Sequence, residues 1–258
     1  MAKKNTWGDC VLAIDAGTQS IRAALIDFNG NIKKIVKTEI EPYFSVQPGW
    51  AEQNPDYFWK TLCATSKKLF SDKSIQKDSI KAVSLTTQRN TMINLDKDGK
   101  PLRPAIIWLD RRKAKAENWP PAYLKYILKA INMYDTAIYT IMECEANWIA
   151  QNQPEIWDRT YKFLFLSGYF TYKLTGEFTD STGNQVGYVP FDFKKQEWSK
   201  DSDFKWKMFP YITRDRLATL VKPSELLGAI SKKASKETGI PERLPVIAAA
   251  ADKACEVL

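Results

Sequence analysis

Histidine is absent from the 258-residue sequence. Nucleophilic catalysis by a Ser-His-Asp or Cys-His arrangement is therefore excluded, and so are metal sites with histidine ligands. Any general base in this chain must be a different side chain. We expect a carboxylate or a lysine in that role.

Cysteine is scarce, and the 4 cysteines stand far apart at positions 10, 63, 144 and 255. No C-x-x-C pair occurs, which argues against a zinc site and against a disulfide framework. We expect all of them to be reduced.

Long apolar segments are also missing. No run of about 18 apolar residues is present, and the opening MAKKNTWGD lacks the apolar region of a signal peptide. We therefore expect a cytoplasmic protein with no membrane partner. The sequence is 44% apolar, which is enough to fill the core of one large domain or two small ones.

Basic blocks are absent, although the formal charge is +8. A positive excess can indicate a nucleic-acid partner, but Lys and Arg are spread along the chain beside Asp and Glu. We interpret the charge as a solvated surface that also favours anionic substrates, and we expect no nucleic-acid partner.

The segment Val11–Arg22, VLAIDAGTQSIR, predicts a β-hairpin with a polar tip. An apolar run leads to Asp15, and a second apolar run extends from Ile21 to Phe28. Such a tip suits a phosphate and its metal ion, because Asp15 can hold Mg²⁺ directly or through water. An ordinary hairpin with a polar turn is the alternative.

Several residues of the tip could contact phosphate. Gly17 lets the backbone approach a ligand closely, and the side chains that follow can hydrogen-bond phosphate oxygens. These are Thr18, Gln19 and Ser20. The tip is not a Walker loop, because G-x-x-x-x-G-K-[ST] is absent and a strand, not a helix, follows.

The next elements predict a sheet covered by a helix. Asn29-Gly30 is a tight-turn signal before a strand at 32–40, which makes a three-stranded meander. Asn54-Pro55 begins a helix of about four turns with apolar residues at helical spacing. Short strands follow at 80–87 and 91–95, and the apolar segment 105–108 comes next.

Two polar clusters follow these strands. They are Gln88-Arg89-Asn90 and Asp110-Arg111-Arg112. Strand ends are the usual place for a site in an α/β protein. For Arg111 and Arg112 we favour the alternative, which is that they are solvated turn residues.

Residues 113–176 predict a mostly helical insert with three helical segments, at 123–131, 146–150 and 163–174, the last ending at Gly176. Residues 178–198 predict loops and short strands. A strand at 226–230, a helix at 232–238 and an apolar strand at 244–251 complete the pattern.

The last strand leads directly to Asp252. An aspartate where a strand becomes a helix can cap the helix, and the helix dipole there favours its ionised form. The sequence stops at Leu258, before such a helix could complete a few turns. We therefore expect these residues to be the front part of a longer protein.

Six motifs occur in order along the chain and carry a family resemblance. They are DAGTQSIR at 15–22, GWAEQNP at 49–55, TQRNT at 87–91, GKPL through WLDR at 99–111, KLTG at 173–176 and LPVIAAAAD at 244–252. Together they resemble the N-terminal domain of the FGGY carbohydrate kinases, which include glycerol kinase, xylulokinase and ribulokinase. The resemblance covers the whole chain but only about the first half of a family member.

The resemblance implies an α/β fold. It would be a ribonuclease-H-like domain of the actin, hexokinase and sugar-kinase superfamily, with a mixed sheet, flanking helices and a helical insert. Residues 1–258 would form the sugar-binding domain, and the C-terminal nucleotide-binding domain, with most of the adenine site, would lie outside this chain. The expected activity is ATP-dependent phosphorylation of a sugar or polyol hydroxyl.

The resemblance also implies residue roles. Asp252 would be the catalytic base, and Asp15 would act on Mg²⁺. The nucleotide phosphates would face Gly17, Thr18, Gln19, Ser20 and Arg22, and the sugar or polyol would be lined by Arg89, Asn90 and Trp108. ATP and Mg²⁺ are the implied cofactors. A homodimer is one expectation for assembly, which the sequence leaves open.

Departures from the family pattern concern the substrate. Glycerol kinases carry Gln-Arg-Glu-Thr where this chain has Gln-Arg-Asn-Thr at 88–91, so one carboxylate for a glycerol hydroxyl is missing. Xylulokinases carry Gln-Met-His-Gly there, which a histidine-free chain cannot supply. Lys253 stands where Gln or Asn is usual. We therefore expect an uncharacterised sugar-kinase branch.

Two other classes of function remain as alternatives. One is a non-catalytic relative that binds sugar or nucleotide as a sensor. The presence of both Asp15 and Asp252 argues against this alternative. The other is a nucleic-acid module on a ribonuclease-H-like sheet. That reading needs several metal-binding carboxylates at strand ends and a basic stripe with aromatics, and neither is found.

Overall fold

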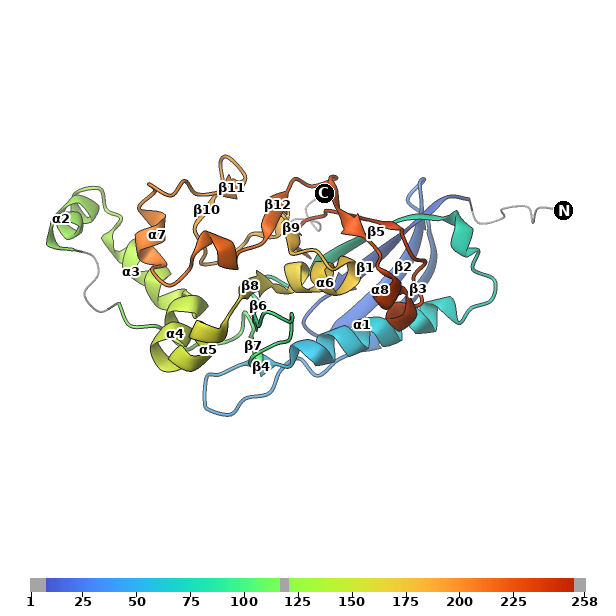
Figure 1. Cartoon of the computed structure of the whole chain (residues 1–258), viewed down its shortest axis with the longest axis horizontal. Coiled ribbons are helices and arrows are strands. Elements are labelled where there is room, and N and C mark those ends of the chain that lie inside the picture. The colour runs from blue at the N-terminus through green and yellow to red at the C-terminus, as the bar shows by residue number, and fades with distance from the viewer. Residues whose placement is uncertain (1–7, 117–120, 253–258) are drawn as a thin grey trace.

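The computed structural model describes residues 8–116 and 121–252, and its apolar side chains form two hydrophobic cores (Figure 1). The first core lies on a six-stranded sheet with the order β13-β14-β5-β1-β2-β3. Its strands are β1 (Cys10–Ala16), β2 (Ser20–Asp27), β3 (Ile32–Glu39), β5 (Ile80–Thr87), β13 (Leu226–Ala229) and β14 (Pro245–Ile247). β1 is antiparallel to β2 and parallel to β5, and β5 is parallel to β14. The predicted mixed sheet is confirmed.

The predicted hairpin and meander are both present. β1 and β2 pair so that Asp15 lies opposite Arg22, and β2 pairs antiparallel with β3. Alternate residues of β1 are buried, among them Leu12 and Ile14. This period of two turns one face of the hairpin toward the core.

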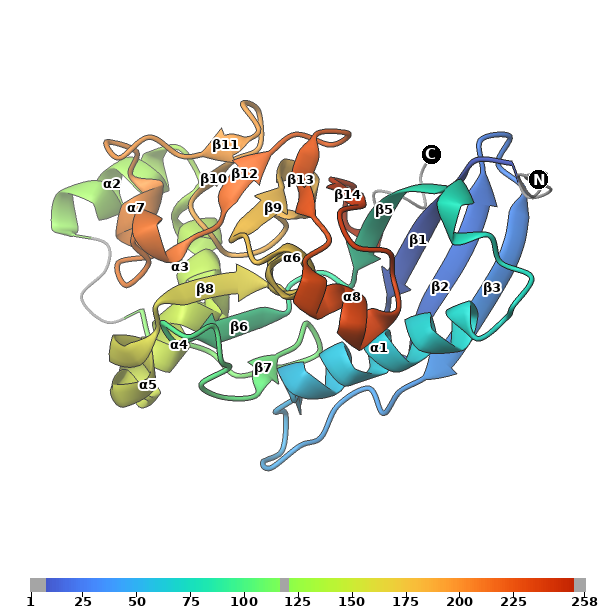
Figure 2. The same cartoon turned by 45° about the vertical axis from the view of Figure 1, so that its right-hand side comes forward.

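Three helices contribute to the first core. They are α1 (Pro55–Phe70), α6 (Leu166–Thr175) and α8 (Lys232–Thr238). In Figure 2, α1 and α8 lie in front of the sheet. α1 begins as predicted, because the Asn54 side chain accepts a hydrogen bond of 2.8 Å from the backbone N–H of Asp56. Phe58, Leu62 and Leu69 are each at most 1% exposed, and burying each side chain contributes roughly 1.5–3 kcal/mol.

The second core surrounds a smaller antiparallel sheet with the order β4-β7-β6-β8. Its strands are β4 (Glu52–Gln53), β6 (Met92–Leu95), β7 (Ala105–Ile106) and β8 (Lys162–Phe165). The helices of this region are α2 (Ala122–Ala130), α3 (Tyr134–Glu143), α4 (Glu145–Asn152), α5 (Pro154–Arg159) and α7 (Lys205–Met208). They lie at the opposite end of the molecule from β1, β2 and β3 (Figure 1). The helices α2 to α5 lie within the helical insert predicted at 113–176, whereas α7 follows that insert in the sequence.

Short elements connect the two regions. β9 (Thr179–Ser181) pairs in parallel with β12 (Thr219–Val221), and β10 (Phe191–Asp192) pairs with β11 (Glu197–Trp198). The 3₁₀ helices are η1 (Lys77–Ser79), η2 (Thr182–Asn184) and η3 (Arg214–Arg216). Within 8–116 and 121–252, no helix combines the length and the apolar composition that crossing a membrane requires.

Two predicted elements are wrong in extent. Phe163 and Leu164 belong to the edge strand β8, because their backbone pairs with β6, and the helix begins only at Leu166. The apolar strand expected at 244–251 is reduced to Pro245–Ile247. Residues 248–251 leave the sheet, and Asp252 therefore does not follow a strand directly. The helix expected after Asp252, and Lys253, lie outside the described residues.

Candidate active site

The parallel strands bring three segments to one edge of the large sheet. β1, β5 and β14 run in the same direction, so their carboxyl ends lie at the same edge. Asp15 is near the end of β1, Arg89 and Asn90 follow β5, and the segment leading to Asp252 follows β14. This edge is where an α/β sheet commonly binds its ligands.

The hairpin tip is a tight, polar turn. The Gly17 N–H donates to the Ser20 carbonyl at 3.0 Å, which closes the turn. Asp15 Oδ2 forms an ion pair of 2.6 Å with Arg22 Nη1, and the two side chains are 33% and 45% exposed. The pair is therefore accessible to a ligand, and an exposed pair of this kind adds little to stability.

A cavity of about 540 Å³ opens beside the tip. Among its lining residues are all five predicted phosphate-binding residues, namely Gly17, Thr18, Gln19, Ser20 and Arg22. Lys37 and Tyr43 also line it, and neither was predicted. Lys37 lies opposite Arg22 in the pairing of β2 and β3, so two cations face this cavity. Alternation along β3 could have indicated Lys37, but only once its partner strand was known.

Trp108 lies against the hairpin tip. Its indole Nε1–H donates to Thr18 Oγ1 at 3.0 Å, and the residue is 51% exposed. Trp108 lines the same cavity as the phosphate-binding residues. Arg89 and Asn90, with which it was grouped as a sugar-binding residue, do not line that cavity.

Arg89 and Asn90 form a second polar group, together with a residue that the sequence did not indicate. Asn90 adopts a positive φ of 46°, and its Nδ2 donates to Glu145 Oε1 at 2.6 Å. Glu145 begins α4 and is 8% exposed. Desolvation by burial raises the pKa of the Glu145 carboxyl from 4.5 to about 8, although the hydrogen bond from Asn90 acts in the opposite direction.

The segment that leads to Asp252 is held by individual side-chain and backbone hydrogen bonds instead of by a strand ladder. The hydroxyl of Thr86 donates to the Ala250 carbonyl at 2.8 Å, and the hydroxyl of Ser181 donates to the Ala249 carbonyl. The Ala251 N–H donates to the Gly183 carbonyl at 3.2 Å. Thr86 is also the residue paired with Asp15 on β1, so Asp15 and Asp252 are linked through β5.

Gly183 can lie this close only because it lacks a side chain. A Cβ at this position would be 2.9 Å from the Ala250 Cβ and 3.1 Å from its Cα. The loop is fixed from below by the buried carboxylate of Asp180, which accepts hydrogen bonds from Ser167, Asn184 and Gln185. Burial raises the pKa of Asp180 to about 6, and these hydrogen bonds oppose the rise.

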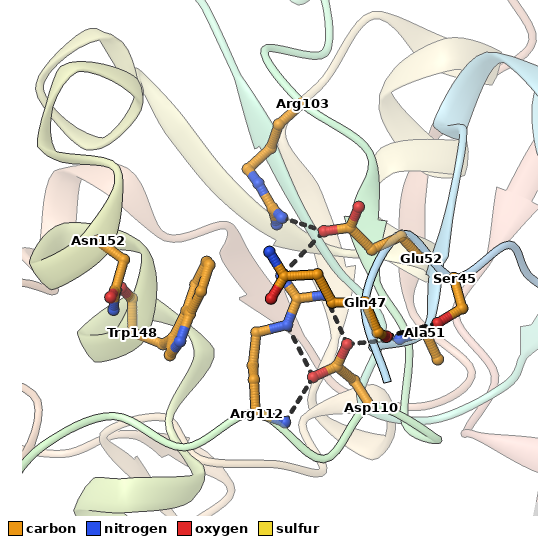
Figure 3. Close-up of polar contacts among 9 residues, drawn as sticks. All are labelled: Ser45, Gln47, Ala51, Glu52, Arg103, Asp110, Arg112, Trp148 and Asn152. Atoms are coloured by element: carbon orange, nitrogen blue, oxygen red, sulfur yellow. Dashed lines mark hydrogen bonds and ion pairs between the residues drawn. The ribbon is translucent and has the colours of Figure 1, made fainter. Parts of the chain in front are cut away.

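A buried ionic network lies beside the smaller sheet (Figure 3). Arg112 binds Asp110 through Nη2 at 2.6 Å and Nε at 2.8 Å, and its Nη1 contacts Glu52 at 2.9 Å. Arg103 also binds Glu52. All four side chains are at most 7% exposed. Burial lowers the pKa of Arg103 to about 10, so it remains protonated at neutral pH.

The interpretation of Arg112 as a solvated turn residue is therefore wrong, whereas Arg111 is exposed as predicted. The Arg112 guanidinium lies 3.9 Å from the ring centroid of Trp50 and 4.6 Å from that of Trp148. Figure 3 shows Trp148 of the helical insert facing Arg112. Asp110 also accepts a hydrogen bond of 2.6 Å from the Ala51 N–H. The network thus joins the insert to the segment that follows the meander.

Asp15 is the predicted ligand for an implied Mg²⁺ ion. In the part of the chain that the structure describes, no group of three or more His, Cys, Asp or Glu side chains could hold a metal by itself. Mg²⁺ often binds through one or two carboxylates together with substrate phosphates. A half-buried carboxylate, paired with an arginine that lines the cationic cavity, fits an ion that arrives with a nucleotide.

Comparisons with known proteins define the class to which this fold and site belong. The structure of a xylulose kinase from Rhodospirillum rubrum is 21% identical and matches with a TM-score of 0.80 over 96% of this chain and 51% of that chain. The fold is therefore that of a sugar kinase, as expected.

Sequence comparisons give the family. A sequence model described as "FGGY family of carbohydrate kinases, N-terminal domain" matches residues 10–258. The glycerol kinase of Thermococcus kodakarensis is 29% identical over 228 residues, which are 85% of this chain and 45% of that protein. The xylulose kinase of Staphylococcus epidermidis is 26% identical over 248 residues, 96% of this chain and 48% of that protein.

The chain belongs to the FGGY family of carbohydrate kinases. It spans about half the length of the curated relatives that it matches. The resemblance carried by the six motifs is confirmed.

Proposed function

We propose that this chain is the sugar-binding N-terminal domain of an ATP-dependent carbohydrate kinase, and that the nucleotide-binding domain lies outside it. The kinase transfers the γ-phosphoryl group of ATP to a hydroxyl of a sugar or polyol. Family membership supports the reaction class. The observation that carries the proposal is the meeting of the hairpin tip, the Arg89–Asn90 segment and the Asp252 segment at one sheet edge.

Within this proposal, Asp252 is the base. Its carboxylate accepts the proton of the attacking hydroxyl as the new O–P bond forms and the bond to the ADP oxygen breaks. Since the sequence has no histidine, a carboxylate is the natural choice for this step. Ser181, Gly183 and Thr86 fix the backbone just before Asp252, and this rigid support suits a group that must be aligned with its substrate.

The phosphate and metal roles fall to the hairpin tip. Arg22 and Lys37 offer positive charge to the phosphates, and the tip offers hydroxyls and backbone N–H groups. Asp15 would hold Mg²⁺, which supplies electrostatic stabilisation of the charge on the transferring phosphoryl group. Phosphoryl transfer depends mainly on such positioning and electrostatics.

Sugar recognition falls to Arg89, Asn90 and Trp108. Arg89 and Asn90 offer hydrogen-bond donors and an acceptor to neighbouring hydroxyls, and Trp108 offers an exposed apolar face to the C–H side of a polyol. We place the protein in the cytoplasm, without nucleic-acid or membrane partners, and a homodimer is the assembly we expect.

Release of ADP by the full-length protein, measured across a panel of ketoses, aldoses and polyols with MgATP, tests the proposal. We expect ADP release that depends on one of these compounds, with equal amounts of phosphorylated product. Saturable sugar binding without any ADP release would instead show a sensor. If no member of the panel binds and none is turned over, the proposed function is refuted.

A further inference from the structure

The pair formed by Asn90 and Glu145 joins two distant parts of the chain. Asn90 lies in the loop after β5, and Glu145 is the first residue of α4 in the helical insert. Their side chains meet at 2.6 Å, and Glu145 is 8% exposed. The carboxyl group of Glu145 is thereby presented to the segment that carries the predicted sugar-binding residues.

Polar atoms around this pair lack protein partners. Arg89 Nε and Asn90 Oδ1 are buried without a hydrogen bond, and so are both amide atoms of Gln88. Gln88 is only 3% exposed. Leaving a buried donor or acceptor unpaired is unfavourable. The cluster of Gln88, Arg89 and Asn90 therefore calls for a hydrogen-bonding ligand that can both donate and accept.

Gly187 lies close against the cluster. A Cβ at Gly187 would be 2.4 Å from Asn90 Oδ1 and 3.2 Å from Phe165, so the chain leaves no room for a side chain here. The chain thus crowds Asn90 from one side while Glu145 contacts it from another. The Asn90 amide is held in a defined orientation, although its Oδ1 gains no partner.

A purely structural role explains Glu145 poorly. Burial of a carboxyl group is unfavourable unless the group is fully paired, and a well-packed apolar side chain is often at least as stabilising in such a place. Burial raises the pKa of this carboxyl to about 8, which reflects that penalty. The buried position of the Glu145 carboxyl group is explained if this group binds a ligand.

We propose that Glu145 is a specificity-determining residue that hydrogen-bonds a hydroxyl of the substrate beside the hydroxyls bound by Arg89 and Asn90. This inference rests on the proposed function. It deepens it by assigning the substrate to polyhydroxy compounds with neighbouring hydroxyls, since a carboxyl group beside Arg89 and Asn90 can hydrogen-bond a second hydroxyl. The carboxyl comes from the insert, 55 residues beyond Asn90 in the sequence.

Steady-state kinetics of full-length Glu145→Gln test this inference, with glycerol, xylitol, D-xylulose and D-gluconate as probes. Glutamine retains the size of glutamate and an oxygen for Asn90, but its amide cannot act as a carboxyl. We expect KM for the preferred compound to rise about 10-fold or more, with kcat and KM for ATP within about twofold. Glu145→Ala should raise this KM further.

Glu143→Gln is the matched control. Glu143 lies two positions earlier, at the end of α3, and contacts Lys113. Its KM values should equal those of the wild type. An unchanged KM for every probe in Glu145→Gln would overturn the inference.

Direct binding separates this inference from the proposed function. If the wild type releases no ADP with any probe, the kinase proposal fails, and thermal-shift titration with the same four compounds then decides the role of Glu145. A compound that stabilises the wild type but not Glu145→Gln supports the role. Equal stabilisation of both proteins, or of neither, refutes it.

Discussion

Replacing Arg112 with alanine should destabilise the protein strongly, because the arginine is the central cation of a buried network. Its guanidinium binds Asp110 through two nitrogens, contacts Glu52, and lies against the rings of Trp50 and Trp148. The wild-type network balances two arginines against two carboxylates. The substitution leaves Arg103 as the single cation of this group for both Asp110 and Glu52.

The magnitude follows from this loss of balance. Breaking a buried ion pair by removing one partner costs about 3–5 kcal/mol, because the other charge stays buried. In a domain of this size, each kcal/mol lowers Tm by roughly 2–4 °C, so the expected loss is on the order of 10 °C. Arg112→Lys keeps the charge but loses the two-pronged geometry and the ring contacts, and it should fall between the wild type and Arg112→Ala.

Thermal unfolding followed by circular dichroism measures the effect. Arg111→Ala is the matched control, because Arg111 is the exposed neighbour in the same loop, and its Tm should change by no more than about 2 °C. Equal Tm values for Arg111→Ala and Arg112→Ala would refute the interpretation that the network joins the insert to the segment that follows the meander.

Three further predictions concern the site. Gly183→Ala should lower kcat of the full-length protein about 10-fold or more with little change in KM for the sugar, because the added Cβ displaces Ala250 and hence Asp252. Steady-state kinetics measure this effect. An unchanged kcat would contradict the role of Gly183 in positioning Asp252. Glu145→Gln should gain stability over the wild type as the pH rises from about 4.5 to about 8. Between these pH values the folded wild type holds a proton on Glu145 that the unfolded chain has lost, so its free energy of unfolding falls as the pH rises. The glutamine of the variant does not titrate. Tm values of both proteins at pH 5 and pH 8.5 test this, and a Tm difference between them that is the same at both pH values would contradict it. The 258-residue chain alone should bind MgATP with a Kd in the millimolar range or weaker, since most of the adenine site is expected in the other domain. Micromolar binding measured by calorimetry would contradict the placement of the adenine site in that other domain.

Local signals predicted the elements that depend on local physics. The alternation around Val11–Arg22 and the turn at Asn29-Gly30 indicated the meander, and Asn54 with Pro55 indicated the start of α1. These patterns act through steric and hydrogen-bond preferences of neighbouring residues. They therefore remain visible without a structure.

Elements decided by distant partners were not visible. Phe163 and Leu164 occur in a continuous apolar run that suits a buried helix as well as a strand, and only pairing with β6 decides between them. The sequence pattern around Arg112 is typical of a turn, and only the tertiary structure shows that Arg112 contacts Glu52 and Trp148.

In the candidate site, too, features set by neighbouring residues were predicted and features set by distant residues were not. The hairpin tip was predicted because its residues are consecutive in the sequence. Glu145 and Lys37 reach the site from other elements, and only the tertiary structure shows that Glu145 contacts Asn90 and that Lys37 lies beside Arg22.

Turnover of Asp252→Asn in the full-length protein tests the central claim most directly. ADP release with the preferred sugar or polyol gives kcat, and calorimetric titration of that compound gives its Kd. If Asp252 accepts the hydroxyl proton, kcat should fall about 10²-fold or more while the Kd changes little. Near-normal turnover by Asp252→Asn would contradict the assignment of the base and, with it, the proposed mechanism of phosphoryl transfer.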